Sequence, residues 1–386
     1  MNDLLSALYL FFQDLRKDIN NEHGISNRLS NIIYNYYSLL RKSGRYDPSI
    51  TAQNFAAIIQ ELNLPVPAEF MNILRSSEII HDVDSMQDTH QRDHYFHSMH
   101  TFTLGLFILA TANKTKILFT KYGQNVCKQW AFCALFHDLG YISQKKGQRY
   151  KADISEIYQK LCNNRFILSC FLGDCYSVSI DEAINNNPRE IDELCDIPRR
   201  LLKSILHPDQ LGIPSDYPSL NINNHEDNHI NELFNSKNHG KISQFLLGLC
   251  RSIGESILKK DKQILLDARI GIPVNENIWD DYRDCIDAIG EHSVDDIHKI
   301  DLRNRKINPF IEFLYIVDNM QEYNRPHLVN ISDGFSDLDD KNILEMRNIQ
   351  IEVVDEWLEF TFPHLTAERI KNKVEAISSK YGIKIL

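Results

Sequence analysis

The sequence has no apolar run long enough to cross a membrane, although 43% of its 386 residues are hydrophobic. A transmembrane helix needs about 20 consecutive apolar residues, and the longest candidates, residues 4–12 and 104–112, are too short. The N-terminus lacks a basic leader and a small-residue cleavage site, so we expect no signal peptide. These features favour a cytoplasmic location without membrane partners.

Paired cysteines and an excess of basic charge are also missing. The eight cysteines are scattered without a C-x-x-C pair, a pattern typical of buried, reduced thiols. The formal net charge is −11, whereas proteins that bind long nucleic acid usually carry a broad basic face. We therefore do not expect tight binding to long duplex nucleic acid. A small nucleotide or a short single strand can still enter a locally basic pocket.

Internal repeats and low-complexity linkers are absent, and helical periodicity dominates the chain. Residues 143–238 differ, because they are polar and contain five prolines. We expect this stretch to be a helical insertion with long loops, which often form lids. The helices predicted outside it cover residues 3–19, 26–42, 51–62, 68–80, 94–112, 124–138, 239–259 and 309–323.

The C-terminal tail has a different pattern. Apolar residues alternate at Ile349, Ile351 and Val353, and a second strand-like run follows at 357–362, so we predict a β-hairpin. A helix over 367–380 and a short end at 383–386 complete an α+β appendage. The predicted fold is mainly α, with a helical N-terminal region at 1–85, a central helical domain at 86–330 that contains the insertion, and the appendage at 331–386.

A His-Asp dipeptide, His137-Asp138, lies at the end of an apolar helical pattern, directly before Leu139-Gly140. Adjacent residues on a helix diverge by about 100°, but the loosened last turn still allows one metal ion to bind both. A neutral imidazole and a carboxylate together suit a divalent ion. Taken alone, the dipeptide is explained equally well by a capping role.

Two other predicted helices carry side chains of the same chemistry. His94, His97 and His100 open the helix over 94–112, three residues apart, so that they can share a face. Asp318 interrupts a nearly continuous apolar helix, where a carboxylate is rarely buried unless it is paired or bound to metal. An ion pair with Arg325, two turns later, is the alternative to a metal.

In this order the motifs resemble the HD superfamily of metal-dependent phosphohydrolases. Phe-His-Ser-x-x-Thr at 96–101 is similar to the first-ligand helix, Leu-Phe-His-Asp-Leu-Gly at 135–140 to the signature, and Tyr-Ile-Val-Asp at 315–318 to the final-aspartate helix. The resemblance covers about 90–326. It implies an HD-type helical bundle and one or two divalent ions (Mn, Mg, Fe, Zn, Co or Ni). The metal ligands that it implies are His97, His137, Asp138 and Asp318.

Several other histidines are alternative or additional candidates for metal binding. Ser98 selects His97 over His94 and His100, because the superfamily pattern has a His-Ser pair. The dipeptide His81-Asp82 lacks the Leu-Gly context, so we expect it to be a decoy. His239 resembles the His-x-x-x-Ser helix start of relatives and is expected in the active site as ligand or phosphate contact. Weaker candidates for a second metal are His207, His225 and His229.

The resemblance also implies catalytic roles. Asp138 is expected to bind metal and orient the attacking water, and His100 or His239 to serve as general acid. Charge on the phosphoryl oxygens must be stabilised, although a solvated basic stretch explains the available cations equally well. The candidates are Lys145, Lys146, Arg149, Arg92 and Arg325, of which Lys146 is assigned to catalysis and the others, with His100, to substrate binding.

The expected reaction is hydrolysis of a phosphoester or phosphoanhydride bond in a nucleotide or similar small substrate. No Gly-Tyr-Pro follows a His-His pair, which disfavours a cyclic-dinucleotide phosphodiesterase, and Leu-Gly after His-Asp disfavours an alarmone hydrolase. A nuclease for short single strands and a non-catalytic nucleotide-sensing module are the alternatives. The N-terminal region is a candidate for homodimerisation.

Overall fold

The computed structural model describes residues 2–17, 25–44, 47–66, 91–92, 94–140, 238–245, 247–248, 280–294, 297–321, 327–328 and 346–386. Helices account for most of these residues, which confirms the prediction of a mainly α protein. The chain divides into two compact units. The first unit contains Met1–Leu64, Ile80–Asp138 and Asp287–Leu386, and the second contains Pro65–Ile79 and Leu139–Ile286.

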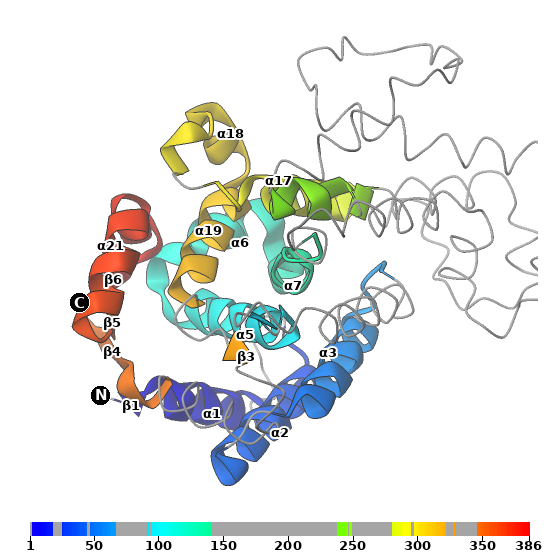
Figure 1. The fold of residues 1–386 in the computed structure, drawn as a ribbon, viewed down its shortest axis with the longest axis vertical. Helices are drawn as coiled ribbons and strands as arrows, with labels where there is room; N and C mark the ends of the chain where they lie inside the picture. The colour runs from blue at the N-terminus through cyan, green and yellow to red at the C-terminus, as the bar shows by residue number, and fades with distance from the viewer. Residues whose placement is uncertain are drawn as a thin grey trace, which may run out of the picture. The chain divides into compact units, whose positions relative to one another are not determined.

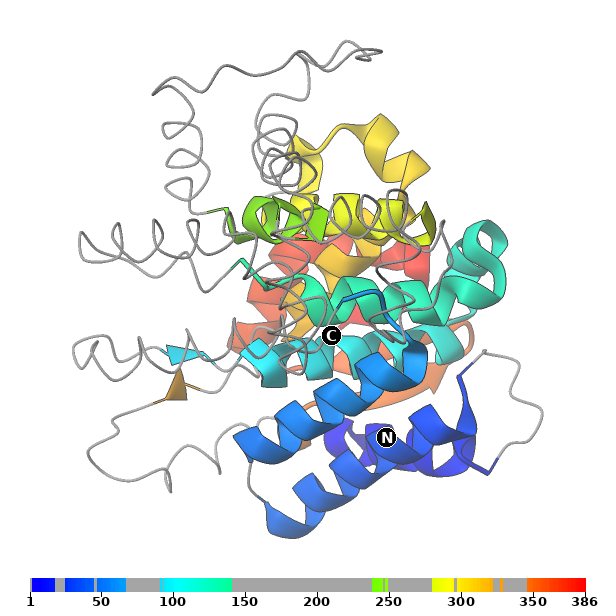
Figure 2. The ribbon, with the colours of Figure 1, turned by 90° about the vertical axis from the view of Figure 1, so that its right-hand side faces the viewer.

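Three helices near the N-terminus pack in sequence, α1 on α2 and α2 on α3 (Figures 1 and 2). Each begins after a side chain, Asp3, Ser26 or Asp47, that accepts a hydrogen bond from a backbone amide of the first turn. The last begins three residues before its predicted start, because Pro48 suits the first helical position. The bounds are α1 Leu4–Leu15, α2 Asn27–Ser43 and α3 Pro48–Leu62.

Three largely buried helices form the centre of the first unit, and α5 packs against both α7 and α19. They match the predictions over 94–112, 124–138 and 309–323 to within about two residues at each end. Every residue of α19 is buried. The bounds are α5 His94–Thr111, α7 Val126–Phe136 and α19 Pro309–Gln321, with η1 Asn113–Thr115, α6 Lys116–Tyr122 and η2 Gly123–Asn125 between the first two.

The contact between α5 and α7 depends on one glycine. Trp130 of α7 is fully buried, and its indole Nε1 donates a hydrogen bond of 3.0 Å to the carbonyl oxygen of Phe102 on α5. Its ring lies where a Cβ on Gly105 would stand. The two helices can therefore approach closely only because residue 105 has no side chain.

A four-stranded sheet joins the two ends of the described chain, in the order β1-β4-β5-β6 (Figure 1). The predicted hairpin is confirmed, since β4 and β5 are antiparallel and close with Val354 opposite Trp357. Asp355 in its turn has a φ of 55°, as tight hairpin turns require. The N-terminal strand β1, which was not predicted, pairs with β4. The bounds are β1 Asn2–Asp3, β4 Gln350–Val354, β5 Trp357–Thr361 and β6 Ile383–Ile385.

The tail packs on the central helix α19 through α21 (His364–Ser378), which connects β5 to the parallel strand β6. Glu312 of α19 is buried at this contact and accepts hydrogen bonds from Lys380 and the Tyr381 hydroxyl. Arg305 of α18 (Leu302–Ile307) pairs with the same carboxylate at 3.3 Å. A buried charge persists only when it is paired in this way. The other short elements are β2 Gln91–Arg92, β3 His327–Leu328, η5 Asp280–Tyr282, α17 Arg283–Glu291, η6 Ile297–Lys299 and η9 Ser379–Tyr381.

Within the second unit, a helix over 239–245 lies against the glycine of the His-Asp-Leu-Gly motif. The Gly140 amide donates a hydrogen bond of 2.8 Å to the Ser243 hydroxyl. A Cβ on Gly140 would overlap the carbonyl oxygen of His239. The predicted helix over 68–80, residues 143–237 of the predicted insertion and the predicted helical residues 249–259 lie outside the described residues.

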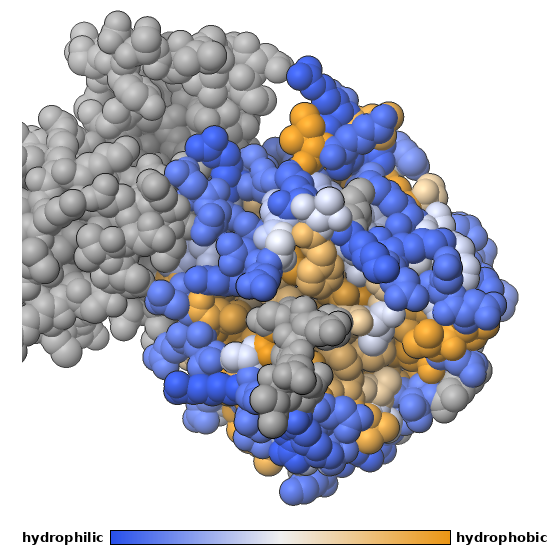
Figure 3. All heavy atoms as spheres, turned by 180° about the vertical axis from the view of Figure 1, so that it is seen from behind, coloured by the Kyte–Doolittle hydropathy of each residue, from blue (hydrophilic) through white to orange (hydrophobic). Residues whose placement is uncertain are grey.

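Among the described residues, no single helix is both long and apolar enough to cross a membrane, and only the bent pair Phe96–Thr111 and Asn113–Phe136 meets these criteria when its two parts are combined. Figure 3 shows a surface that is mostly hydrophilic, with apolar atoms gathered between polar rims. The large apolar side chains exposed in the described ranges are Leu10, Leu39, Leu302, Ile307, Val353, Val354 and Leu386.

Replacing Gly105 with alanine should destabilise the first unit. The helix propensity of alanine favours the change by about 1 kcal/mol, but overpacking against a buried ring costs about 1 to 3 kcal/mol or more. We expect a net loss in the free energy of unfolding measured by chemical denaturation. The exposed Lys116→Ala change is the control, and a Gly105→Ala protein as stable as the parent would contradict the close approach.

Candidate metal centre

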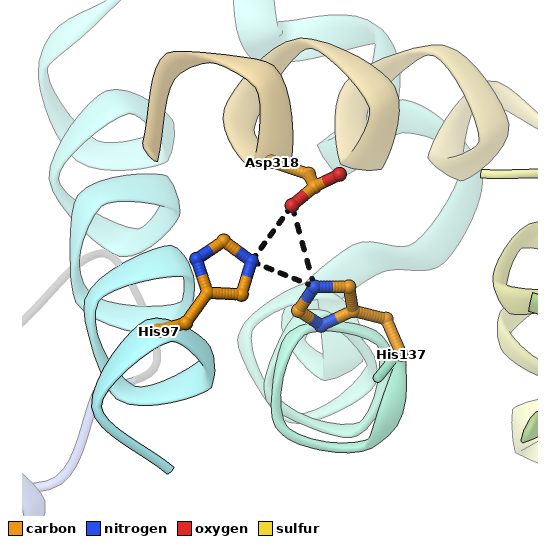
Figure 4. A group of neighbouring side chains, drawn as sticks. All are labelled: His97, His137 and Asp318. Atoms are coloured by element: carbon orange, nitrogen blue, oxygen red, sulfur yellow. Dashed lines mark hydrogen bonds and ion pairs between the residues drawn. The ribbon is translucent and has the colours of Figure 1, made fainter. Parts of the chain in front are cut away.

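Three buried side chains from three helical segments meet in the first unit (Figure 4). His97 lies on α5, His137 directly after α7, and Asp318 on α19. His97 Nε2 is 2.8 Å from Asp318 Oδ1 and 3.2 Å from His137 Nε2. His137 Nε2 is 3.5 Å from Asp318 Oδ1. Residues 221 positions apart in the sequence are thus brought into direct contact.

The backbone fixes the proton on His137. This residue caps the C-terminus of α7, and its Nδ1 lies 2.8 Å from the carbonyl oxygen of Ala134. Because a carbonyl can only accept, Nδ1 carries the hydrogen that is donated, and the lone pair of the neutral ring is on Nε2. That nitrogen is the one directed at His97 and Asp318. A backbone hydrogen bond of this kind is how proteins orient a histidine for metal binding.

Asp138 follows directly and contributes both carboxylate oxygens to the same space. Its Oδ1 is 3.6 Å from His137 Nε2, and its Oδ2 is 3.7 Å from His97 Nε2. The side chain is almost completely buried. Both members of the dipeptide reach the cluster because α7 ends at Phe136 and the next residues form a turn.

A fifth side chain, His292, was missed in the sequence. It lies just after α17, is buried, and has its Nε2 3.7 Å from Asp138 Oδ1. Its Nδ1 donates to the carbonyl oxygen of Ile289 at 2.6 Å, so its Nε2 also carries the lone pair. The sequence does indicate that His292 is buried, because Cys285, Ile289 and His292 are spaced so that they share one apolar face of a helix.

The donor set and its spacing fit a divalent cation. Ligand atoms that each lie about 2.1 Å from one ion are separated by about 3 to 3.5 Å, and the three distances of 2.8, 3.2 and 3.5 Å between His97, His137 and Asp318 are close to this. Two groups could hold an ion: His97, His137 and Asp318, and His137, Asp138 and His292. Imidazole nitrogen combined with carboxylate oxygen suits several first-row metals.

The electrostatics of the cluster also favour a cation. Burial lowers the pKa of His137, but the carboxylates of Asp138 and Asp318 outweigh burial and raise that pKa above its usual range. Two buried carboxylates therefore stabilise positive charge on the ring between them. A metal ion supplies such charge while using the lone pair that the proton would otherwise occupy.

His100, predicted to contact substrate or act as general acid, lies in an aromatic pocket. Its ring centroid is 4.2 Å from that of Phe96, and its two nitrogens lie 3.5 Å from the hydroxyls of Tyr36 and Tyr37. Burial and the nearby His97 lower its pKa to about 3. The ring is thus a neutral part of the contact between α2 and α5, and we leave it out of the site.

The described structure does not decide the roles of the remaining predicted residues. His239 begins the helix over 239–245 in the second unit. Arg92 pairs through its backbone with His327, and His94 opens α5, but the structure does not describe either side chain. The residues outside the described ranges are Lys145, Lys146, Arg149, Arg325, His81, Asp82, His207, His225 and His229. Their roles stay predictions.

Comparison with known proteins identifies no relative. No family model matches the chain, and neither a curated protein nor a solved structure does. The resemblance to the HD superfamily therefore depends on the sequence motifs alone.

Loss of Asp318 should remove the metal. Asp318→Ala deletes a carboxylate that contacts both His97 and His137, so we expect its bound metal, measured by elemental analysis after purification, to fall well below that of the parent. Asp82→Ala is the matched control, because we expect His81-Asp82 to be a decoy. Equal loss of metal in both variants would refute the assignment.

His100 should make the protein less stable in acid. Its folded pKa of about 3 lies below the value of about 6.5 for an unfolded histidine. The unfolded chain therefore binds the extra proton first, and stability falls as pH drops from about 6.5 towards 3. His100→Phe should weaken this dependence, measured as the free energy of unfolding from pH 8 to pH 5 with a chelator present. An identical pH profile in the variant would show that His100 is not buried as described.

Proposed function

We propose that this chain is a metal-dependent phosphohydrolase of the HD type that acts on a nucleotide or a similar small phosphorylated substrate. The observation that carries the proposal is the convergence of His97, His137, Asp138 and Asp318 in one buried cluster. Their order in the sequence and their helical settings resemble those of the superfamily. A merely structural ion pair needs neither two histidines nor two carboxylates at this spacing.

Under this proposal His97, His137, Asp138 and Asp318 hold a divalent ion, and His292 extends the ligand set towards a second. The distances support this, because His292 reaches Asp138 Oδ1 while Asp138 Oδ2 faces His97. Such an ion polarises a phosphoryl oxygen and makes water a better nucleophile at neutral pH.

The chain's own side chains would orient the reactants. Asp138 has two oxygens that point at different histidines, so it can bind metal and still accept a proton from an attacking water. The charge on the phosphoryl oxygens requires cationic groups. Lys145, Lys146 and Arg149, which follow the signature within a few residues, are the first candidates for this role, and Arg92 and Arg325 are others. His239 stays the candidate for general acid from its sequence motif.

The burial of the ligands favours a small substrate. Each of the four is at most 8% exposed, which leaves little access for a duplex, and the net charge of −11 opposes binding to long nucleic acid. A short single strand and a nucleotide sensed without turnover are the alternatives, and the test below distinguishes them.

A screen of phosphate release over nucleotides, short oligonucleotides and divalent metals tests the proposal. We expect turnover of a nucleotide by the metal-loaded parent, and a loss of about 100-fold or more in Asp138→Ala and His137→Gln, because each removes a ligand. The control is His298→Ala, since His298 is an exposed histidine on η6 and its loss should leave the rate unchanged.

Other outcomes have definite meanings. Cleavage of oligonucleotides in preference to every nucleotide would replace the proposed substrate with a single strand. Tight nucleotide binding by a metal-loaded protein without turnover would favour the sensing module. A parent that carries no metal and hydrolyses nothing would contradict the enzyme proposal.

A further inference from the structure

A buried amide close to the candidate metal centre has no hydrogen-bond partner among the residues that the structure describes. Gln321 is 1% exposed, and neither its Oε1 nor its Nε2 forms a hydrogen bond in the part of the chain that the structure describes. Leaving a buried polar group unpaired is costly, and native proteins keep few such groups without a reason. A ligand that completes the pairing is one such reason.

The helix places Gln321 beside the site. It is the last residue of α19 and lies three positions after Asp318 on a continuous helix. Residues at this spacing lie on the same face, with Cβ atoms about 5 to 6 Å apart. The Asp318 side chain is 11% exposed, so this face of α19 is not completely closed. A molecule that touches Asp318 is therefore within reach of the longer glutamine side chain.

A neighbouring amide shows that the missing partner is not general to this helix. Asn319 is also buried, but its Nδ2 donates a hydrogen bond of 2.8 Å to the carbonyl oxygen of Tyr315. Helix α5 repeats the unpaired pattern. Thr101 of α5 is fully buried four residues after His97, and its hydroxyl has no partner among the described residues. Both α5 and α19 thus carry, one turn beyond their candidate metal ligand, a polar group without a partner in the described ranges.

We propose that Gln321 determines substrate specificity by binding the nucleoside part of the substrate next to the scissile phosphate. This inference depends on the function proposed above. Phosphoryl oxygens at neutral pH only accept hydrogen bonds, so they satisfy Nε2 but leave Oε1 unpaired. A sugar hydroxyl or the edge of a base offers a donor and an acceptor together, which matches both atoms of the amide. The substrate class is therefore a nucleotide rather than a simple phosphate ester.

The first test is the stability of Gln321→Met. Removing an unpaired buried amide in favour of an apolar side chain of similar length should leave the melting temperature unchanged or raise it. Asn319→Leu is the matched control and should melt at a lower temperature, because it removes a paired amide. A Gln321→Met protein that melts as low as Asn319→Leu would overturn the proposal by showing a structural role.

The second test compares substrates. The probes are the mono- and triphosphates of adenosine and guanosine, their 2′-deoxy and 3′-deoxy forms, and p-nitrophenyl phosphate, whose leaving group has no such donor–acceptor pair. In Gln321→Met the ratio of kcat/KM for the best nucleotide to that for p-nitrophenyl phosphate should fall by about 10-fold or more. The ratio should not change in His298→Ala, and an unchanged ratio in Gln321→Met would overturn the proposal.

The deoxy forms and the two bases identify the contact. If Gln321 binds a sugar hydroxyl, the deoxy substrate that lacks this hydroxyl is hydrolysed more slowly by the parent but not by Gln321→Met. If Gln321 binds the base, the parent prefers adenine or guanine and Gln321→Met loses that preference. If the parent hydrolyses no probe, the proposed hydrolase function is wrong. The role of Gln321 in nucleotide binding is then tested on its own by thermal melting. Nucleotides with Mn²⁺ should then raise the melting temperature of the parent more than that of Gln321→Met, and equal shifts or none would overturn it.

Discussion

The structure depends on the balance of charge in one buried cluster. Two carboxylates, Asp138 and Asp318, are held within 4 Å of imidazole nitrogens and away from solvent. Isolated carboxylates in such a place would be strongly destabilising. The backbone hydrogen bond to Ala134 leaves His137 with a lone pair directed at the same point. The cluster therefore requires positive charge, and a divalent ion fits both its spacing and its chemistry.

The surrounding packing keeps this cluster in place. Gly105 allows α5 to approach the Trp130 ring of α7, so the helices that hold His97 and end at His137 lie in direct contact. The third helix of the cluster, α19, is bound to the tail through Glu312, Lys380 and Tyr381. The tail in turn forms a sheet with the N-terminal strand. Both ends of the described chain thus support the helix that supplies Asp318.

Hydrophobic periodicity in the sequence predicted the positions of the main helices and of the hairpin. It did not predict which side chains contact one another across different segments. The helices α5, α7 and α19 and the β4–β5 hairpin follow from periodicity, because their burial is decided within each segment. His97 and His100 share a helix, yet the first faces Asp318 and the second faces two tyrosines of α2. Spacing alone cannot distinguish them, since the partners come from other segments.

The sequence by itself determined the helices α5, α7 and α19 and the hairpin, since each depends on residues a few positions apart, and its motifs singled out four candidate ligands. Only the tertiary structure decided which side chains meet. It added His292, placed His100 in an aromatic pocket, and left Gln321, three residues after Asp318, without a partner in the described part of the chain. Those outcomes depend on helix packing between segments up to 221 residues apart, and contact at that range is set by the fit of whole faces rather than by local pattern.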